Sequence, residues 1–150
     1  MQVILGMALV HHCREMGNVN MGANQIATIE RNLNEICKDS HDGNEPPLAC
    51  CTFETTSAQG APVWIQAMPG TVNMSYGLSA DPTELLRNQG VRGPADLYIV
   101  DWEAGEYATF GFEGVSTRDQ AFFVDQLFVK VLGCDDETYQ LTAKTESLDE

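Results

Sequence analysis

Residues 79–90, SADPTELLRNQG, contain the signals for both ends of one short helix. Asp81 is placed to cap the first turn, Pro82 follows where a missing N–H costs nothing, and Glu84 completes a capping box. Gly90 supplies the left-handed conformation that commonly ends a helix. An isolated helix this short is marginal in water. The chain must therefore fold so that this helix packs against other elements.

Strand patterns stand on both sides of this helix. Three candidates precede it, at 48–56, 63–68 and 71–77, and a Pro-Gly turn joins the second to the third. Residues 96–114 follow it and are typical of a second hairpin, which turns at 103–105. The short helix is therefore predicted to connect two groups of antiparallel strands.

Two longer helix patterns enclose these strands. After Met21, apolar residues recur at helical spacing and Asn24 is a candidate cap, which predicts an amphipathic helix. The apolar residues are Ile26, Ile29, Leu33, Ile36 and Cys37. Residues 116–133 predict a second helix with a wide apolar stripe, capped by Ser116 and ended by Gly133.

In chain order the prediction is helix, three strands, short helix, two strands and helix. This order is typical of an α+β domain in which helices cover an antiparallel sheet. We expect the domain to span 22–142, after an N-terminal extension at 1–21 and before an acidic tail at 143–150. The acid-rich end is expected to fray into solvent after Leu141.

The charge of the chain limits its partners. Its 150 residues include 22 acidic and 8 basic ones, for a formal net charge of −14. Such a surface repels phosphate backbones and anionic lipid, so we expect no nucleic-acid partner and no membrane partner. The same charge suits a soluble protein whose partner is basic or amphipathic.

The first residues, MQVILGMALVHHC, are apolar but do not form a signal-peptide pattern. No basic residue precedes the apolar stretch, and histidines stand where a small-residue cleavage site would lie. Five cysteines form no even disulfide framework, which favours reduced thiols. We therefore predict a cytoplasmic protein, with either Met1 or Met21 as its natural start.

Two stretches of sequence resemble a known group of folds. PVWIQAMPGTVNMSYGLSADPTELL, at 62–86, resembles two strands and the short middle helix of the bacterial type III secretion chaperone-like superfamily. YATFGFEGVSTRDQAFFVDQLFVKVLG, at 107–133, resembles the last strand and the closing helix of the same superfamily. The resemblance spans about residues 22–142 and rests on apolar positions and turns.

The resemblance implies a non-enzymatic, chaperone-like module that binds a protein client. The superfamily includes dimeric chaperones that wrap an extended segment of an effector protein, and domains described as sensory transduction regulators. A homodimer is therefore expected, with Leu85 and Leu86 of the middle helix at its interface. The alternative function is a small-molecule-sensing regulatory domain, which would need a closed pocket between the closing helix and the sheet.

Few residues suggest metal or thiol chemistry. Adjacent His11, His12 and Cys13 match no zinc-site spacing and cannot easily all bind one tetrahedral ion, so we expect no metal and no cofactor. Cys50 and Cys51 are neighbours on a predicted strand and should point to opposite faces, one into the core and one accessible. A redox role is the less favoured interpretation, because free cysteine is commonly a small buried apolar residue.

Nothing in the sequence converges on a catalytic centre. It contains no nucleophile-elbow motif. The acid pairs Asp101 with Glu103 and Asp135 with Asp136 could supply acid–base groups, but in a chain this acidic they are more often a solvated face. We therefore expect no enzymatic activity.

Apolar surface on the second strand is the remaining functional candidate. If Ile65 and its alternate neighbours face the helices, Trp64 and Met68 lie on the open side beside Asn73 and Ser75. Exposed Trp and Met on a sheet form an adaptable protein-binding surface. The alternative is that a helix or the dimer partner covers Trp64.

Overall fold

Six strands and three helices make up the structure, a computed structural model that describes residues 21–40, 49–134 and 139–147. The elements are α2 (Met21–Ser40), β1 (Ala49–Thr56), β2 (Pro62–Met68), β3 (Thr71–Ser75), α3 (Pro82–Asn88), β4 (Tyr98–Glu103), β5 (Tyr107–Gly111), α4 (Thr117–Gln126), the π-helical turn η1 (Leu127–Val131) and β6 (Thr142–Ser147). The predicted α+β class is confirmed.

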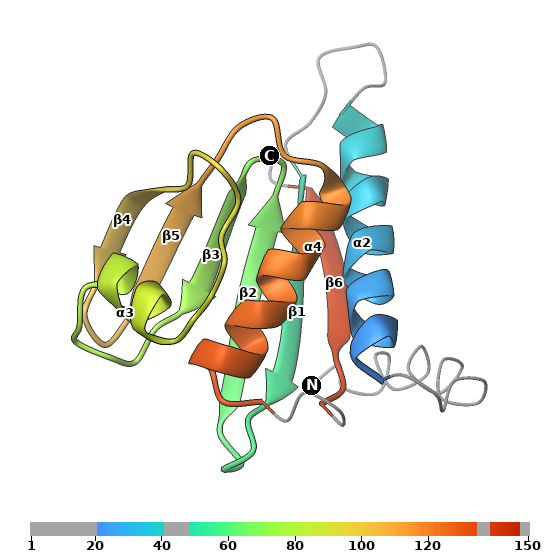
Figure 1. The fold of residues 1–150 in the computed structure, drawn as a ribbon. Coiled ribbons are helices and arrows are strands. Elements are labelled where there is room, and N and C mark those ends of the chain that lie inside the picture. The colour runs from blue at the N-terminus through green and yellow to red at the C-terminus, as the bar shows by residue number, and fades with distance from the viewer. Residues whose placement is uncertain (1–20, 41–48, 135–138, 148–150) are drawn as a thin grey trace.

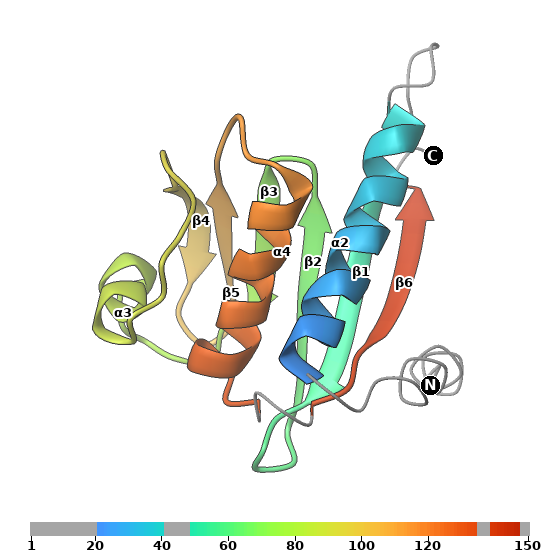
Figure 2. The ribbon, with the colours of Figure 1, turned by 45° about the vertical axis from the view of Figure 1, so that its right-hand side comes forward.

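The strands form one antiparallel sheet in the order β4-β5-β3-β2-β1-β6. Helices α2 and α4 lie side by side on one face of this sheet, over its middle and its β6 end (Figures 1 and 2). Helix α3 lies at the β4 end (Figure 1). The sheet therefore has one face that both long helices cover.

The core lies between these two helices and the sheet. Ile29, Leu33 and Ile36 recur at helical spacing on α2 and are fully buried, as the amphipathic pattern predicts. On α4, the ring of Phe123 packs edge-on against Phe110 and Phe112, with ring centroids 5.7 and 6.2 Å apart. Aromatic pairs favour this T-shaped geometry, so apolar burial and ring contacts together hold α4 on the sheet.

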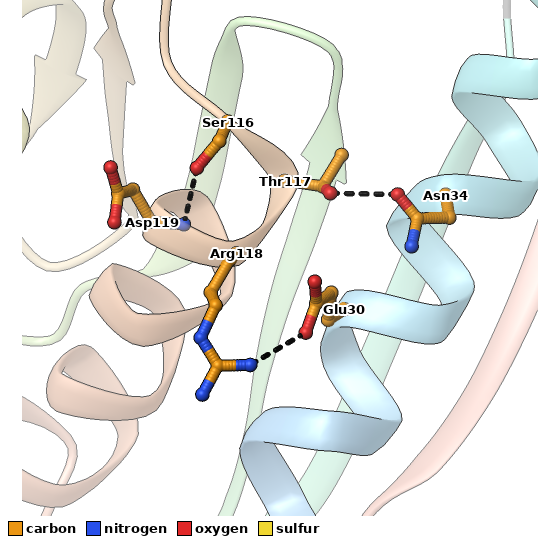
Figure 3. A network of polar contacts seen from close by, with 6 residues as sticks. All are labelled: Glu30, Asn34, Ser116, Thr117, Arg118 and Asp119. Atoms are coloured by element: carbon orange, nitrogen blue, oxygen red, sulfur yellow. Dashed lines mark hydrogen bonds and ion pairs between the residues drawn. The ribbon is translucent and has the colours of Figure 1, made fainter.

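Two polar contacts also join α2 to α4 (Figure 3). Thr117 Oγ1 donates a hydrogen bond to Asn34 Oδ1 over 2.7 Å. The Arg118 guanidinium lies 3.1 Å from a carboxylate oxygen of Glu30. Both contacts lie at the solvent edge of the helix pair, where an ion pair contributes at most about 1 kcal/mol. They fix how the helices sit against each other more than they stabilise the fold.

The short helix α3 has the ends that its sequence predicts. The Asp81 carboxylate accepts hydrogen bonds from the N–H groups of Thr83 and Glu84, over 2.8 and 3.4 Å. Gly90 follows the helix with φ +72°, the left-handed conformation expected of a stop. Leu86 is buried in the core of its own chain. The helix is therefore held by packing as well as by its caps.

Two buried glutamines of α4 hold loops in place. Gln126 accepts the N–H of Arg92 over 3.2 Å and donates to the carbonyl of the same residue over 3.1 Å. Gln120 donates to the carbonyls of Met68 and Thr71, over 3.0 and 3.3 Å, and so holds the β2–β3 turn. Buried amides need such partners, and these bonds make α4 an anchor for loops on both of its sides.

The sixth strand corrects the prediction for the acidic end of the chain. Residues 142–147 do not fray after Leu141; they form β6, which pairs with β1 from Thr142 opposite Glu54 to Ser147 opposite Ala49. The buried Tyr139 precedes the strand, and its hydroxyl donates a hydrogen bond to the carboxylate of Asp125 on α4. The paired backbone and this buried anchor hold residues 142–147 in the sheet although TAKTES shows no apolar alternation, so the domain extends beyond 142.

Two helix boundaries also differ from the predictions. Helix α2 begins at Met21, ahead of the predicted cap Asn24. The closing helix is α-helical only to Gln126 and continues as the π-helical turn η1, after which Gly133 ends it with φ +76°. Residues 1–20, which include His11, His12 and Cys13, residues 41–48, and the pair Asp135 and Asp136 lie outside the described residues.

Candidate functional site

The two faces of the sheet differ in what covers them. Helices α2 and α4 pack on one, the helix face, whereas none of the described helices packs on the other, the open face (Figures 1 and 2). On β2 the alternation is clear, because Ile65 and Ala67 are fully buried on the helix face while Trp64, Gln66 and Met68 are half-buried on the open face. Trp64 and Met68 therefore lie where strand alternation predicts them.

The strand register aligns open-face side chains into a row that crosses the whole sheet. From β4 to β6 this row is Asp101, Thr109, Asn73, Gln66, Thr52 and Lys144. The four central members form a chain of hydrogen bonds, which we call the amide ladder. Thr109 Oγ1 donates to Asn73 Oδ1 over 2.8 Å.

The amide ladder continues through two longer contacts. Asn73 Nδ2 donates to Gln66 Oε1, and Gln66 Nε2 donates to Thr52 Oγ1, each over 3.4 Å. Uncharged polar groups on this face thus bind to one another from β5 to β1. A partner that covered them would therefore face a surface whose hydrogen bonds are already largely made.

A second row contains two aromatic residues. Trp64 lies opposite Glu54 on β1, and Tyr107 lies opposite Glu103 on β4. Between them, Ser75 accepts the backbone N–H of Trp64 over 3.2 Å and donates its hydroxyl to the carbonyl of the same residue over 3.3 Å. This hydroxyl takes the place of main-chain ladder bonds where β3 ends, and it holds the tryptophan backbone beside the end of that strand.

Asp101 links the open face to the edge strand β4. Its carboxylate accepts the backbone N–H of Trp102 over 2.9 Å and the hydroxyl of Tyr107. The bond to Asp101 raises the pKa of Tyr107, because a phenolate there would face that carboxylate. Both predicted acid-pair members on this strand, Asp101 and Glu103, are exposed. Two of the acceptor positions of Asp101 are therefore already engaged within the chain.

Charge is distributed unevenly over the open face. Its positions on the three adjacent interior strands β5, β3 and β2, which we call the central patch, carry no charged residue. They are Tyr107, Thr109, Gly111, Thr71, Asn73, Ser75, Pro62, Trp64, Gln66 and Met68. Acidic residues flank the patch on β4, β1 and β6, and we call Asp101, Glu103, Glu54 and Glu146 the acidic rim. The cation Lys144 lies among them, 3.3 Å from Glu146.

The prediction that one thiol of the adjacent cysteine pair is accessible is wrong. Both Cys50 and Cys51 are buried, although they point to opposite faces. Cys50 is a short side chain on the open face, next to Thr52 on its own strand and opposite Glu146 on β6, and such neighbours shield it. Burial raises the pKa of Cys50 and raises that of Cys51 to about 11. Both thiols are therefore protonated at neutral pH, unlike a reactive cysteine.

The two leucines predicted at a dimer interface have different surroundings. Leu86 is 6% exposed and belongs to the core of its own chain. Leu85 is half-buried and packs against that core. Only Leu85 thus retains surface for a second copy of the chain, and the interface itself stays a prediction.

The space between the closing helix and the sheet is filled where a small-molecule pocket was the alternative prediction. Phe110 from β5, Phe112 directly after that strand and Phe123 from α4 are almost fully buried, and the ring of Phe123 contacts each of the other two edge-on. Farther along the helix, the ring of Phe128 lies 5.5 Å from that of Tyr139. A ligand at this place would have to displace buried aromatic rings.

The amide ladder is the feature that sequence reasoning missed. Strand alternation could have assigned Thr52, Gln66, Asn73 and Thr109 to the open face one by one. Only the register between strands brings them into one row, and no turn motif between β3 and β5 fixes that register, because α3 and β4 intervene.

Among the described residues, no group of three or more His, Cys, Asp or Glu side chains is arranged to hold a metal ion. Within the same residues, no helix has the length and apolar content needed to cross a membrane. A comparison with family models finds no match, and comparisons with curated protein sequences and with solved structures find none at a significant level.

Proposed function

We propose that this chain is a non-enzymatic protein-binding module and that its open face is the binding surface. The observation that carries the proposal is the uncharged central patch, which contains Trp64, Tyr107 and Met68 and is bordered by the acidic rim. Protein interfaces have this anatomy, because charged residues are depleted at their centres while aromatic residues and Met are enriched. A polar rim around such a centre is equally typical.

The state of the side chains in the patch supports the proposal. Trp64 and Met68 are half-buried, so their positions are partly fixed before any partner arrives. The amide ladder fixes Gln66 between them and the polar residues Asn73 and Thr109 on the neighbouring strands. A preorganised surface loses less conformational entropy on association, and tryptophan is among the residues that contribute most to binding energy.

The proposal also includes the kind of partner, the cellular compartment and the oligomeric state. The resemblance to the secretion chaperone-like superfamily supports a protein client as the partner and a homodimer through α3, and the cysteine usage and the first residues support a cytoplasmic location. The order of α2 to α4 is the one expected from that resemblance, with β6 as an additional strand. In the dimer, Leu85 would meet its copy across a two-fold axis.

Photocrosslinking tests the proposed surface. The photoreactive residue p-benzoylphenylalanine would replace Gln66 in the central patch or, as a control, the exposed Arg31 on α2. Irradiation in cells should give protein-sized adducts from position 66 and few from position 31. Equal adducts at both positions, or none at 66, would contradict binding through the open face. A small molecule retained in the native mass spectrum of the full chain would instead favour the sensing alternative.

Sedimentation tests the proposed dimer. Wild type should associate at micromolar concentration, and Leu85→Glu should weaken association at least tenfold, because burying a leucine contributes roughly 1.5–3 kcal/mol. The exposed Leu78 supplies the matched control, Leu78→Glu, with circular dichroism as the folding check. A wild-type chain that sediments as a monomer throughout would remove the dimer and leave binding by the open face untouched.

A further inference from the structure

We infer that the occupant of the open face is a basic polypeptide segment whose cations meet the acidic rim on opposite sides of the central patch. This inference rests on the proposed function and names the chemical class of partner for the same surface. It follows from where the charged residues lie in the rows that cross the open face, and from which of these charges have an ion-pair partner within the chain.

The row of aromatic residues carries an acid at two of its positions, one on each side. Glu54 lies opposite Trp64, and Glu103 lies opposite Tyr107. Both carboxylates belong to exposed residues, and no cation of the described segments lies within ion-pair distance of either. A partner that covered Trp64 and Tyr107 would bring its own flanking residues onto these two carboxylates.

The distance across the patch sets the spacing of the partner's cations. Strands β1 and β4 are four strand positions apart in the sheet, and neighbouring strands are about 4.8 Å apart, so Glu54 and Glu103 are separated by about 19 Å. An extended segment covers that distance in about six residues, and a helix covers it in about thirteen. Two lysines or arginines at either spacing, with apolar residues between them, would match the surface.

Charge also disfavours a second copy of this chain as the occupant. If two open faces met about a two-fold axis, rim carboxylates would face rim carboxylates, and like charges placed together across an interface oppose association. Lys144, the cation on β6, is already paired with Glu146 of its own chain and does not offset this repulsion. The formal net charge of −14 adds repulsion at long range.

A peptide selection tests the inference without a known client. The immobilised full chain would be screened against a displayed library of random 16-residue peptides, and binders would be counter-screened on Trp64→Ala and Met68→Ala. Peptides that bind wild type but lose binding to either variant are patch binders. We expect patch binders to contain about twice the lysine and arginine content of the unselected library, with pairs about six or about thirteen residues apart.

Reversing the charges of Glu54 and Glu103 tests whether these two carboxylates bind the cations of the partner. For a synthetic patch binder, Glu54→Lys/Glu103→Lys should raise Kd about tenfold, because attraction becomes repulsion at both ends of the row. The control Glu35→Lys/Glu113→Lys changes the net charge equally at exposed residues on α2 and after β5, and should change Kd less than twofold. The difference should shrink in 0.5 M salt, where the Debye length falls below about 5 Å.

The outcomes separate this inference from the proposed function. Patch binders without basic enrichment, or with equal Kd changes in the rim and control variants, would overturn the basic partner while the open face remains a protein-binding surface. If every selected peptide binds Trp64→Ala and Met68→Ala as well as wild type, the open face is not the binding surface and both proposals fail.

Discussion

Neighbouring residues on β5 show how differently the two faces of the sheet are stabilised. Phe110 on the helix face is 1% exposed and packs edge-on against Phe123 of α4. Thr109 on the open face is half-buried and donates the first hydrogen bond of the amide ladder to Asn73. One face is held by apolar burial, and the other by bonds between uncharged polar groups.

The two faces contribute unequally to the stability of the fold. Burying a large apolar side chain contributes roughly 1.5–3 kcal/mol, whereas a side-chain hydrogen bond contributes a net of about 0.5–1.5 kcal/mol. The helix face therefore determines whether the chain folds. The open face adds less to folding, so its residues are freer to serve a partner.

Truncating each of the two neighbouring residues on β5 to alanine should affect stability very differently. Phe110→Ala should lower the free energy of unfolding by about 3–5 kcal/mol, because it leaves a cavity in the core beside Phe123. Thr109→Ala should lower it by less than about 1 kcal/mol. Urea denaturation of both variants measures the two losses, and similar values would refute the division of roles between the faces.

The two adjacent thiols on β1 should make different contributions to stability at alkaline pH. Burial raises the pKa of Cys51 on the helix face to about 11, so the unfolded chain loses this proton at lower pH than the folded chain. The protonated Cys51 thiol therefore contributes about 2–3 kcal/mol to the free energy of unfolding below about pH 9, and this contribution is lost as the pH rises toward 11.

The measurement is the free energy of unfolding in urea at intervals from pH 8 to pH 11. Wild type should lose stability over this range, and Cys51→Ala should show a shallower loss. Cys50→Ala is the control on the open face and should retain most of the wild-type slope. If the free energy of unfolding of Cys51→Ala falls with pH in parallel with that of wild type, the Cys51 thiol does not contribute to the pH dependence of stability.

Two glutamines offer a third contrast between the helix side and the open face. Gln126 binds both backbone groups of Arg92 from a buried position, and Gln126→Leu should cost about 1–3 kcal/mol because those groups lose their partner. Gln66→Leu on the open face should cost about 0.5 kcal/mol, because water reaches its ladder neighbours. Thermal unfolding of the two variants compares them, and the reverse order would contradict this account.

The smallest expected effect concerns a place on the open face where packing matters. A Cβ atom on Gly111 would lie 2.6 Å from the ring of Tyr98 on β4, yet this tyrosine is 53% exposed and can move aside. Gly111→Ala should therefore be more costly with Tyr98 present than in a Tyr98→Ala background, by about 0.5–1 kcal/mol. A double-mutant cycle measures this coupling, and a value of zero would show that the ring does not rest on the glycine.

Sequence alone predicted the elements whose signals are local. The cap at Asp81, the stop at Gly90 and the buried stripe of α2 through Leu33 depend on neighbours within one or two turns, and the structure agrees with each. Strand β6 was missed because TAKTES has no apolar alternation, since Ala143 is its only apolar residue. Its pairing with β1 and the anchor at Tyr139 are tertiary effects.

For the candidate site, too, the sequence predicted what depends on local geometry and missed what depends on pairing between strands. Alternation along β2 places Trp64 and Met68 on the open face, which needs only strand geometry. The uncharged patch and the amide ladder depend on register across β5, β3, β2 and β1, which no single stretch of sequence encodes. The burial of Cys50 was missed for the same reason, since its neighbour Glu146 belongs to the unpredicted strand.

The position of β6 in the sheet has a consequence for synthesis of the chain. Its Thr142 hydroxyl contacts the carbonyl of Glu54, 88 residues earlier, so one side of β1 obtains its partner only after nearly all other elements have left the ribosome. Pairings over such long separations form slowly, and an unpaired strand edge invites contact with other nascent chains. During translation the vulnerable edge of this fold is therefore β1, a strand that the finished molecule encloses on both sides.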